Sequence, residues 1–338
     1  MRPTVSAKRA SRPIGMLLAS VAIGYGIAAT GAVVEQPYPN RTIKLVVPYV
    51  AGGPTDIVAR AIADKLSISL RRPIVTENRP GAGGNIGTEA VVRAPPDGHT
   101  LGLLVNTTLT VNPSVYKNVP FDPDKDVRPI SIVTTTGLML AVHPTVPVRS
   151  VADFVAYAKA AAARKEPVTY ASAGIGTPSH LAMEYFRRHA GFDAIHVPYR
   201  SVAPMVVDLL AGQIKIAFTG SAVMADHIRE GRLKGLGVSH AGRSPLAPDI
   251  PTIAESGYPG FTIETYHVMI SPAGISEPVL GLLERELQVA LKRPDLIERF
   301  RLMDIVPLGL AGAGARQRIK DDTQTWAKVV TATNMRLD

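Results

Sequence analysis

Apolar, β-branched runs alternate with longer amphipathic segments from residue 42 to residue 238, and this alternation limits the possible folds more than any other feature. It is typical of strand–helix repeats that build parallel sheets covered by helices. The first repeat places the run 43–47 before the segment 56–66, whose apolar residues recur at helical spacing. Further strands are predicted at 73–77, 101–105, 168–172, 194–197, 214–218 and 236–238, with helices at 85–93, 151–163, 179–189, 204–210 and 223–230.

The strand–helix pattern restarts after Pro147, which predicts two α/β domains. Before it, the apolar runs 130–133 and 138–142 flank the polar residues 134–137 and are suited to cross from one domain to the other. A second apolar run, 266–270, is placed to cross back, so a hinge of two crossings and a ligand cleft between the domains are expected. The expected bounds are 37–139 plus 265–338 for domain 1 and 140–264 for an inserted domain 2.

Residues 1–32 have the layout of a secretory signal peptide. Four basic residues precede the apolar run 14–23, and small residues follow it, so cleavage is expected between Ala29 and Gln36. The alternative is an uncleaved membrane anchor over 14–34, although glycines weaken this segment as a packed span. The sequence contains no Cys, which excludes disulfides and a lipid anchor on an N-terminal Cys. The mature chain is expected to work in the periplasm.

The charge of the mature chain is mildly positive. Residues 1–32 carry four basic and no acidic side chains, so their removal lowers the formal net charge from +9 to +5. The Lys and Arg residues are scattered, and no basic run is interleaved with aromatic residues, so no nucleic-acid partner is expected. A diffuse positive field instead favours small anions at a cleft.

The turn after the first predicted strand is suited to close approach of a ligand to the backbone. Gly52 and Gly53 permit an unusual turn. Pro54 suits the start of a helix, and Thr55 or Asp56 can cap it. Backbone N–H groups at the positive end of a helix favour a carboxylate or phosphate.

A second turn of the same kind joins the predicted strand 168–172 to the helix 179–189 and adds the hydroxyls of Ser172, Thr177 and Ser179. Ligands of α/β sheets bind at the carboxyl ends of the strands, where both turns lie. If each domain contributes one turn, the two grip one anion from opposite sides. Taken singly, either turn is also consistent with ordinary turn chemistry.

Further polar residues follow other predicted strands or stand at the proposed hinge. Each of them is equally consistent with a capping, turn or core role. The candidate ligand-binding residues are Tyr49, Ala51, Gly52, Gly53, Thr55, Asp56, Asn106, Thr107, Thr108, Ser172, Gly174, Gly176, Thr177, Ser179, His180, Tyr199, Thr219 and Tyr266.

Enzyme motifs do not match this sequence. The segment 81–87 fails the G-x-G-x-x-G dinucleotide pattern at its sixth position, Ile86, and no phosphate-binding P-loop motif occurs. The segment 170–174 has half of a nucleophile elbow, with Tyr170 in place of Gly. The eight His residues show no short metal-binding spacing. No enzyme activity, cofactor or metal is expected; an exported hydrolase using Ser172 or Ser179 is the alternative.

Eight segments, taken in order, resemble the Bug receptors, which are the extracytoplasmic solute-binding proteins of tripartite tricarboxylate transporters. The resemblance covers essentially the whole mature chain. The segments are 38–56, 77–88, 96–100, 112–116, 170–180, 196–199, 243–255 and 271–274.

This resemblance implies an α/β fold like that of type II periplasmic binding proteins, in which two Rossmann-like lobes close over a small organic acid. It further implies that the loops 49–56 and 172–180 hold a ligand carboxylate, largely through main-chain groups and water. The solute would pass to a membrane permease, and receptors of this kind are usually monomers. A periplasmic sensor that binds the same acids and reports to a signalling partner is the main alternative.

Two residues depart from the pattern of the family that this sequence resembles. Many relatives carry an acidic residue where this chain has Thr219, which predicts a carboxylate ligand without an amine. Tyr266 replaces a frequent Trp, which is expected to alter the far wall of the cleft.

Overall fold

The structure of the protein, a computed structural model, describes residues 38–333. The predicted signal peptide, residues 1–32, lies outside the described residues. Within 38–333, none of the helices is both long enough and apolar enough to cross a membrane.

The first half of the chain forms a parallel sheet in the order β2-β1-β3, joined at β3 by the antiparallel strand β9 (Glu264–Pro272) from much later in the sequence. Helix α1 begins with Pro54 at its first position and buries Val58, Ile62 and Leu66 along one face. The elements are β1 (Ile43–Val47), α1 (Pro54–Ser69), β2 (Ile74–Asn78), η1 (Ala82–Gly84), α2 (Asn85–Val92), β3 (Thr100–Val105), α3 (Thr107–Thr110) and α4 (Asn112–Val115).

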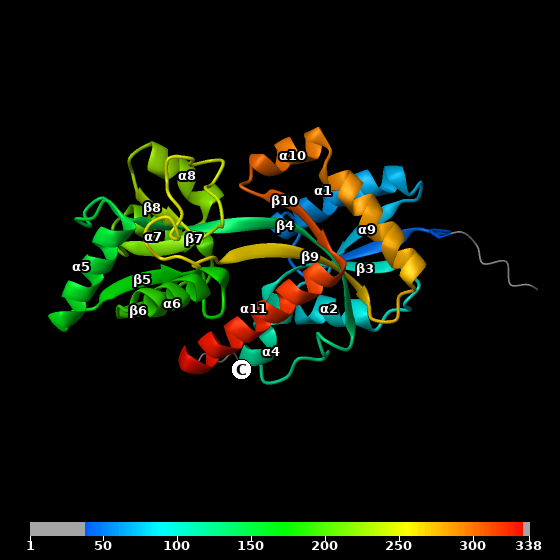
Figure 1. The fold of residues 1–338 in the computed structure, drawn as a ribbon, viewed down its shortest axis with the longest axis horizontal. Coiled ribbons are helices and arrows are strands. Elements are labelled where there is room, and N and C mark those ends of the chain that lie inside the picture. Colours follow the sequence, from blue (N-terminus) through cyan, green and yellow to red (C-terminus); the bar gives the residue numbers. More distant parts are fainter. Residues whose placement is uncertain (1–37, 334–338) are drawn as a thin grey trace, which may run out of the picture. The chain divides into compact units, whose positions relative to one another are not determined.

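Two long strands, β4 (Val127–Val142) and β9 (Glu264–Pro272), run side by side through the centre of the sheet (Figure 1). The apolar runs 130–133 and 138–142 and the polar residues between them are thus one continuous strand of 16 residues. Up to Gly137, β4 pairs with β9, and from Leu138 onward it pairs with two strands of the second half. The strand β4 therefore belongs to both halves of the sheet.

The second half repeats the architecture of the first, with parallel strands β6-β5-β7 and with β7 and β8 antiparallel to β4. Ser150 caps helix α5 by accepting a hydrogen bond from the N–H of Asp153 at 3.0 Å. The elements are α5 (Val151–Ala163), β5 (Val168–Ser172), α6 (Pro178–Ala190), β6 (Ala194–Pro198), α7 (Val202–Leu210), β7 (Ile216–Gly220), α8 (Ser221–Arg229) and β8 (Lys234–Val238).

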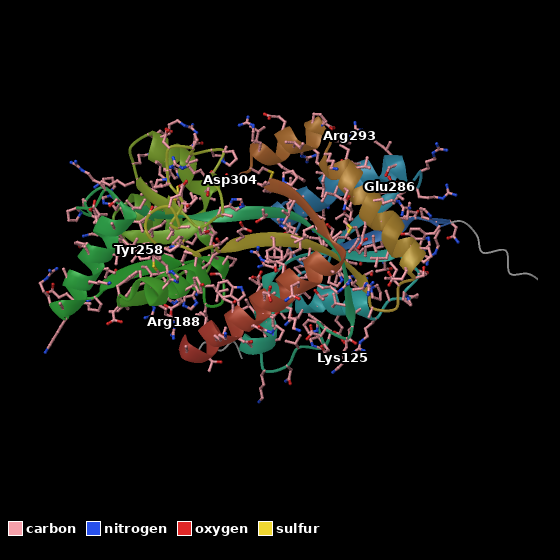
Figure 2. All side chains as sticks on the ribbon, in the orientation of Figure 1. Lys125, Arg188, Tyr258, Glu286, Arg293 and Asp304 are labelled. Carbon is pink, nitrogen blue, oxygen red and sulfur yellow. The ribbon has the colours of Figure 1, made fainter. Side chains whose placement is uncertain are left out.

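The C-terminal segment returns to the first half. Helix α9 packs on α1 in one apolar core, and β10 pairs antiparallel with β4. Asp304, labelled in Figure 2, lies just before β10. Its carboxylate accepts a 2.5 Å hydrogen bond from the hydroxyl of Ser244, which follows β8. The elements are α9 (Glu277–Leu291), α10 (Pro294–Arg301), β10 (Val306–Ala311) and α11 (Gly312–Thr333).

Helix α11 contributes to the cores of both halves. Ala315 and Ile319 pack with Val46 and Leu104 of the first half. Trp326, nearer the end of the helix, packs in the core that contains α5 and α6 of the second half. The two halves are therefore joined by a packed helix as well as by paired strands.

Candidate ligand-binding site

The first glycine-rich loop joins β1 to α1, with Gly52 in the left-handed region at φ 78° and Gly53 as the residue before the helix. Asp56 is 3% exposed and closes this loop. Its carboxylate accepts hydrogen bonds from Gly52 N at 2.9 Å, Arg60 Nε at 2.9 Å and Asn78 Nδ2 at 3.0 Å. The carboxylate of Asp56 is thus committed to the loop itself.

The ionised form of Asp56 is favoured by these contacts. Burial raises the pKa of this carboxyl, but the hydrogen bonds from Arg60, Gly52 and Asn78 outweigh it and lower the pKa to about 2. The position of Asp56 in the first turn of α1 adds to this preference, because a helix N-terminus favours negative charge.

Two main-chain donors at the start of α1 remain available to a ligand. Gly52 N is taken by Asp56, and Gly53 N lies 3.4 Å from Val50 O. The N–H groups of Thr55 and Asp56 have no acceptor within residues 38–333. Ala51, earlier in the same loop, is exposed. The free donors are thus in the first helical turn, and the glycine N–H groups that we expected to be free are partly occupied.

Tyr49 and Thr108 fix the first loop to its neighbours. The Tyr49 hydroxyl accepts from Val105 N at 3.1 Å and contacts Thr108 Oγ1 at 2.7 Å, and Thr108 donates to Gly83 O at 3.0 Å. Burial raises the pKa of Tyr49 to about 12. Thr107, next to Thr108, is partly exposed.

Asn106 connects the end of β3 to the crossing strand β9. Its side-chain oxygen accepts from Tyr266 N at 3.3 Å, and its amide nitrogen donates to Glu264 O at 3.4 Å. Asn106 therefore fixes the end of β3 to β9, beside the Tyr49–Thr108 contact.

The second glycine-rich loop, between β5 and α6, is closed by its own side chains. Ser172 Oγ contacts Gly174 N and O at 3.1 and 3.0 Å. Thr177 Oγ1 donates to Gly174 O at 2.6 Å, and Ser179 Oγ accepts from Ala173 N at 3.0 Å. These bonds hold the loop in one conformation.

The start of α6 offers the same kind of donors as the start of α1. Gly176 N donates to His180 Nδ1 at 3.1 Å, so it is not free. The N–H groups of Ile175, Ser179 and His180 meet no acceptor in the described part of the chain. Each half of the sheet thus supplies uncommitted donors at the carboxyl end of a parallel strand, where α/β proteins bind ligands.

A stacked aromatic group supports the second loop from within the protein. The rings of His180 and His196 lie 3.9 Å apart and nearly parallel, and Tyr170 stacks on His196 at 5.0 Å. Burial and the neighbouring His196 lower the pKa of His180 to about 4. With Gly176 donating to Nδ1, the proton of the neutral His180 ring is on Nε2.

The remaining candidates lie in different surroundings. Tyr199 contacts the second loop through its N–H, which donates to Ser172 O at 2.9 Å, while its hydroxyl donates to Asp208 at 2.8 Å. Thr219 is buried and lies opposite Met139 in the β4–β7 pair. Tyr266 is 1% exposed and packs in the core beneath α11, with the guanidinium of Arg318 5.6 Å from its ring centre.

The structure thus places most of the candidates in two groups, and Thr219 lies in neither. The residues around 49–56 and 106–108 form one hydrogen-bonded group, and those around 172–180 form another with Tyr199. Across residues 38–333, no hydrogen bond or ion pair joins the two loops directly. Two further side chains contact the loops and were not predicted from the sequence. His196 Nε2 lies 2.6 Å from Ser172 Oγ, and His267 Nε2 lies 3.2 Å from Thr55 Oγ1.

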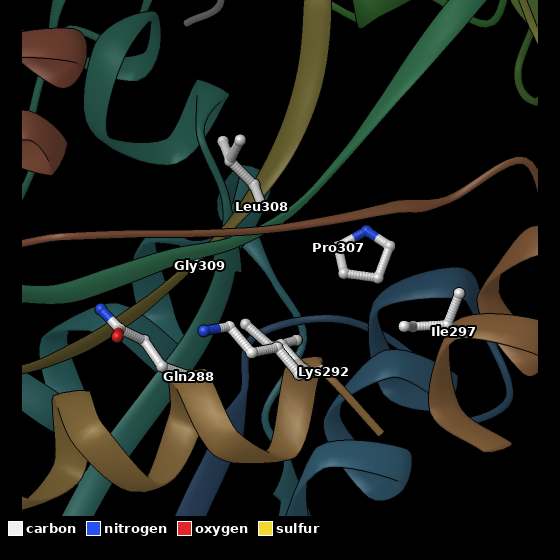
Figure 3. Close-up of a pocket in the computed structure, with 7 residues that line it drawn as sticks. Gln288, Lys292, Ile297, Pro307, Leu308 and Gly309 are labelled. Atoms are coloured by element: carbon white, nitrogen blue, oxygen red, sulfur yellow. The ribbon is translucent and has the colours of Figure 1, made fainter. Parts of the chain in front are cut away.

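A cavity of about 650 Å³ lies elsewhere, between α9, α10 and β10 (Figure 3). None of the predicted ligand-binding residues lines it, so it is separate from the two loops. In the part of the chain that the structure describes, no group of three or more His, Asp or Glu is arranged to hold a metal ion. The cavity is lined by Gln288, Leu291, Lys292, Ile297, Pro307, Leu308 and Gly309.

Comparison with known proteins identifies the family. The family model described as "Tripartite tricarboxylate transporter family receptor" matches residues 58–335. The chain belongs to this receptor family. BugT of Bordetella pertussis is 33% identical over 325 residues, which cover 96% of this chain and 97% of BugT.

Solved structures of similar proteins support the assignment of this chain to the receptor family. The periplasmic binding protein BugD is 33% identical with a TM-score of 0.69, covering 88% of this chain and 99% of BugD. An R. palustris protein solved with adipate is 29% identical with a TM-score of 0.74, covering 88% of this chain and 99% of that protein. The resemblance to Bug receptors, the periplasmic-binding-protein fold and the role as a solute-binding receptor are therefore confirmed.

Proposed function

We propose that this receptor captures a small organic carboxylate between its two glycine-rich loops for a tripartite tricarboxylate transporter. The observation that carries the proposal is the pair of uncommitted helix starts at α1 and α6, one in each half of the sheet. The R. palustris neighbour solved with adipate supports a carboxylate as the ligand. The proposed ligand-binding residues are those of the two loops, with the first-turn N–H groups as the donors.

Main-chain donors are sufficient for useful affinity. A hydrogen bond to a charged group contributes roughly 1.5–3 kcal/mol. Four such bonds, from Thr55, Asp56, Ser179 and His180, therefore approach the ~8 kcal/mol that corresponds to micromolar binding. Isothermal titration calorimetry with a panel of organic acids tests this, and the absence of binding to every carboxylate would refute the proposed function.

The acid bound by this receptor is expected to stay with the protein during purification. Native mass spectrometry of protein purified without refolding is expected to show a copurifying acid. Because the Thr219 side chain carries no negative charge for an ammonium group, we propose a carboxylate without an amine. A calorimetric screen that gave tight binding to glutamate or aspartate, and none to citrate, malate or aromatic acids, would reject this choice.

We propose that the two halves act as lobes that close on the ligand, with bounds of 37–139 plus 265–338 for domain 1 and 140–264 for domain 2. The crossing strands β4 and β9 support this division, and the packing of α11 on both cores limits how far the lobes separate. Limited proteolysis tests the topology. Release of an independently folded 1–140 fragment would contradict it.

The proposed site of action is the periplasm, reached through a signal peptide at 1–32 that is cleaved between Ala29 and Gln36. The similarity of this receptor to the periplasmic binding protein BugD supports this location. The proposed partner is a membrane permease, and the receptor is proposed to act as a monomer. N-terminal sequencing of the exported protein tests the leader. Solute uptake by a deletion strain distinguishes transport from a sensor role.

One contact favours a second candidate, a hydrolase. Ser172 Oγ lies 2.6 Å from His196 Nε2, the arrangement of a nucleophile and its base. However, Ser172 is fully buried and bonded to both main-chain groups of Gly174, so we propose a non-catalytic receptor. We expect Ser172→Ala to weaken binding of the acid, and we expect neither the wild type nor this variant to hydrolyse esters. Ester hydrolysis that disappears in this variant would favour the hydrolase.

A further inference from the structure

His267, on the crossing strand β9, connects the first loop to the other crossing strand. Its Nε2 lies 3.2 Å from Thr55 Oγ1, in the first turn of α1. Its Nδ1 lies 2.8 Å from Thr134 Oγ1, on β4. One imidazole ring thus joins the start of the ligand-facing helix to both strands that run between the halves.

An irregularity in β4 places Thr134 at this contact. Ile132 pairs with Val268, and regular antiparallel pairing would then put Val133 opposite His267. The register shifts between Ile132 and Thr134, so that Thr134 pairs with His267 instead. Such bulges re-aim side chains near functional sites. Here the bulge provides a hydroxyl for the ring.

The three side chains that make these contacts are buried, with exposed fractions of 6% for Thr55, 3% for His267 and 0% for Thr134. Water therefore does not replace these contacts, and each group depends on its neighbour. Burial lowers the pKa of His267 to about 4, so the ring is neutral at ordinary pH. In a neutral imidazole one nitrogen donates and the other accepts, and a Thr hydroxyl serves either role.

We propose that His267 is a positioning residue of the ligand site, which fixes the first turn of α1 to both crossing strands. This inference rests on the proposed function and deepens it by naming the residue that connects the site to the hinge. Thr55 supplies one of the two free N–H groups of α1, so fixing its side chain also fixes the direction of that donor. A ligand that moves this turn on lobe closure acts directly on β4 and β9.

Isosteric variants test this role. Thr55→Val and Thr134→Val each remove one hydroxyl, and His267→Phe removes both ring contacts. We expect hydrogen–deuterium exchange of residues 49–58 in the unliganded protein to rise about tenfold in each variant, as expected when one stabilising contact of a local element is lost. His267→Gln keeps a donor and an acceptor and is expected to restore part of the protection.

A matched control is Ser131→Ala, which removes a buried hydroxyl of the same strand that bonds Leu310 O at 3.2 Å. This variant is expected to leave exchange at 49–58 unchanged. Equal exchange in the control and in both threonine variants would overturn the inference. Thr55→Val and Thr134→Val preserve side-chain volume and are therefore expected to fold. The test then does not depend on whether His267→Phe folds.

Calorimetry with adipate as the probe separates this inference from the proposed function. We expect affinity to fall about tenfold in Thr55→Val and Thr134→Val, the effect of one lost hydrogen bond, and to stay unchanged in Ser131→Ala. Wild-type binding with unaltered affinity in both threonine variants would refute the role of His267 and leave the receptor proposal intact. If wild-type protein binds neither adipate nor any other acid, the receptor proposal fails, and the exchange measurement still decides the role of His267.

Discussion

Polar side chains around both loops make their hydrogen bonds within the protein. Asp56 closes the first loop, and Ser172 and Ser179 close the second. The groups left for a ligand are N–H donors of the first helical turns. A site made of main-chain donors recognises a carboxylate and leaves the rest of the acid to be selected by the surrounding walls.

Replacing Asp56 with Asn tests the closure of the first loop. The amide keeps one acceptor but brings N–H groups toward the donors Gly52 N and Arg60 Nε. We expect a loss of about 2 kcal/mol in the free energy of unfolding, as for hydrogen bonds to a charged group. Urea denaturation measures it, with the exposed Asp64→Asn as the control. Equal stability of the two variants would show that Asp56 does not hold the loop.

The pH dependence of stability reports on the buried His267. Its pKa of about 4 in the folded protein is below the usual value of 6.5, so the unfolded chain takes up the proton first as the pH falls. Neutral His267 therefore contributes fully to the free energy of unfolding above about pH 6.5. As the pH falls from 6.5 to 4, protonation of the unfolded chain lowers this free energy by about 3 kcal/mol. Urea denaturation across this range is expected to show a shallower decline in His267→Phe. An identical decline in wild type and variant would contradict the lowered pKa.

The strand β4 shows how one element serves both halves. It exchanges β9 for β7 as its partner at Gly137, the last residue paired with β9. A Cβ at this position would lie 2.7 Å from His240 Cβ and 3.3 Å from His240 N. Glycine thus allows the segment after β8 to approach the centre of the strand.

Gly137→Ala is therefore expected to destabilise the protein by about 1–3 kcal/mol, the usual cost of overpacking. Thermal unfolding followed by circular dichroism measures the effect. Gly242→Ala is the control, because a Cβ there meets no atom within 4 Å. A melting temperature as high in Gly137→Ala as in the control would mean that His240 moves aside at little cost.

The strands and helices expected between residues 43 and 238 have counterparts in the structure, whereas α9, α10 and α11 were not predicted. The strands 43–47 and 168–172 match β1 and β5, because their apolar residues are bounded by turns. The helices α3 and α4 were not predicted, since a helix of one turn has no periodicity to detect. The strand β10 and its bulge also escaped prediction, because its pairing with β4 depends on residues far away in the sequence.

Of the candidate site, only the uncommitted main-chain donors could be expected from the sequence. Glycine, proline and small polar residues between a strand and a helix indicate free N–H groups, and both helix starts provide them. Which of these groups remain free depends on side chains such as Asp56 and His180. The contacts of His267 and His196 depend on strand register and ring stacking, which no local pattern encodes.

In the whole molecule, the C-terminal helix α11 joins the cores of the two halves. Trp326 is 6% exposed and meets Tyr185 of α6 edge-on, with ring centres 6.2 Å apart. Trp326→Ala is expected to cost about 3–5 kcal/mol. Denaturant unfolding measures the loss, with the exposed Lys328→Ala as the control. A loss below 1 kcal/mol would show that the end of α11 does not stabilise the second half.

The sheet order β3-β9-β4 also governs when the chain becomes able to fold. The strand β3 ends at Val105, yet its neighbour β9 begins at Glu264. The central strands therefore cannot pair until the ribosome has synthesised most of the chain. Pairing over such long separations is slow. Slow pairing keeps a newly made chain of this design unfolded for longer, which is compatible with the export that we propose for this receptor.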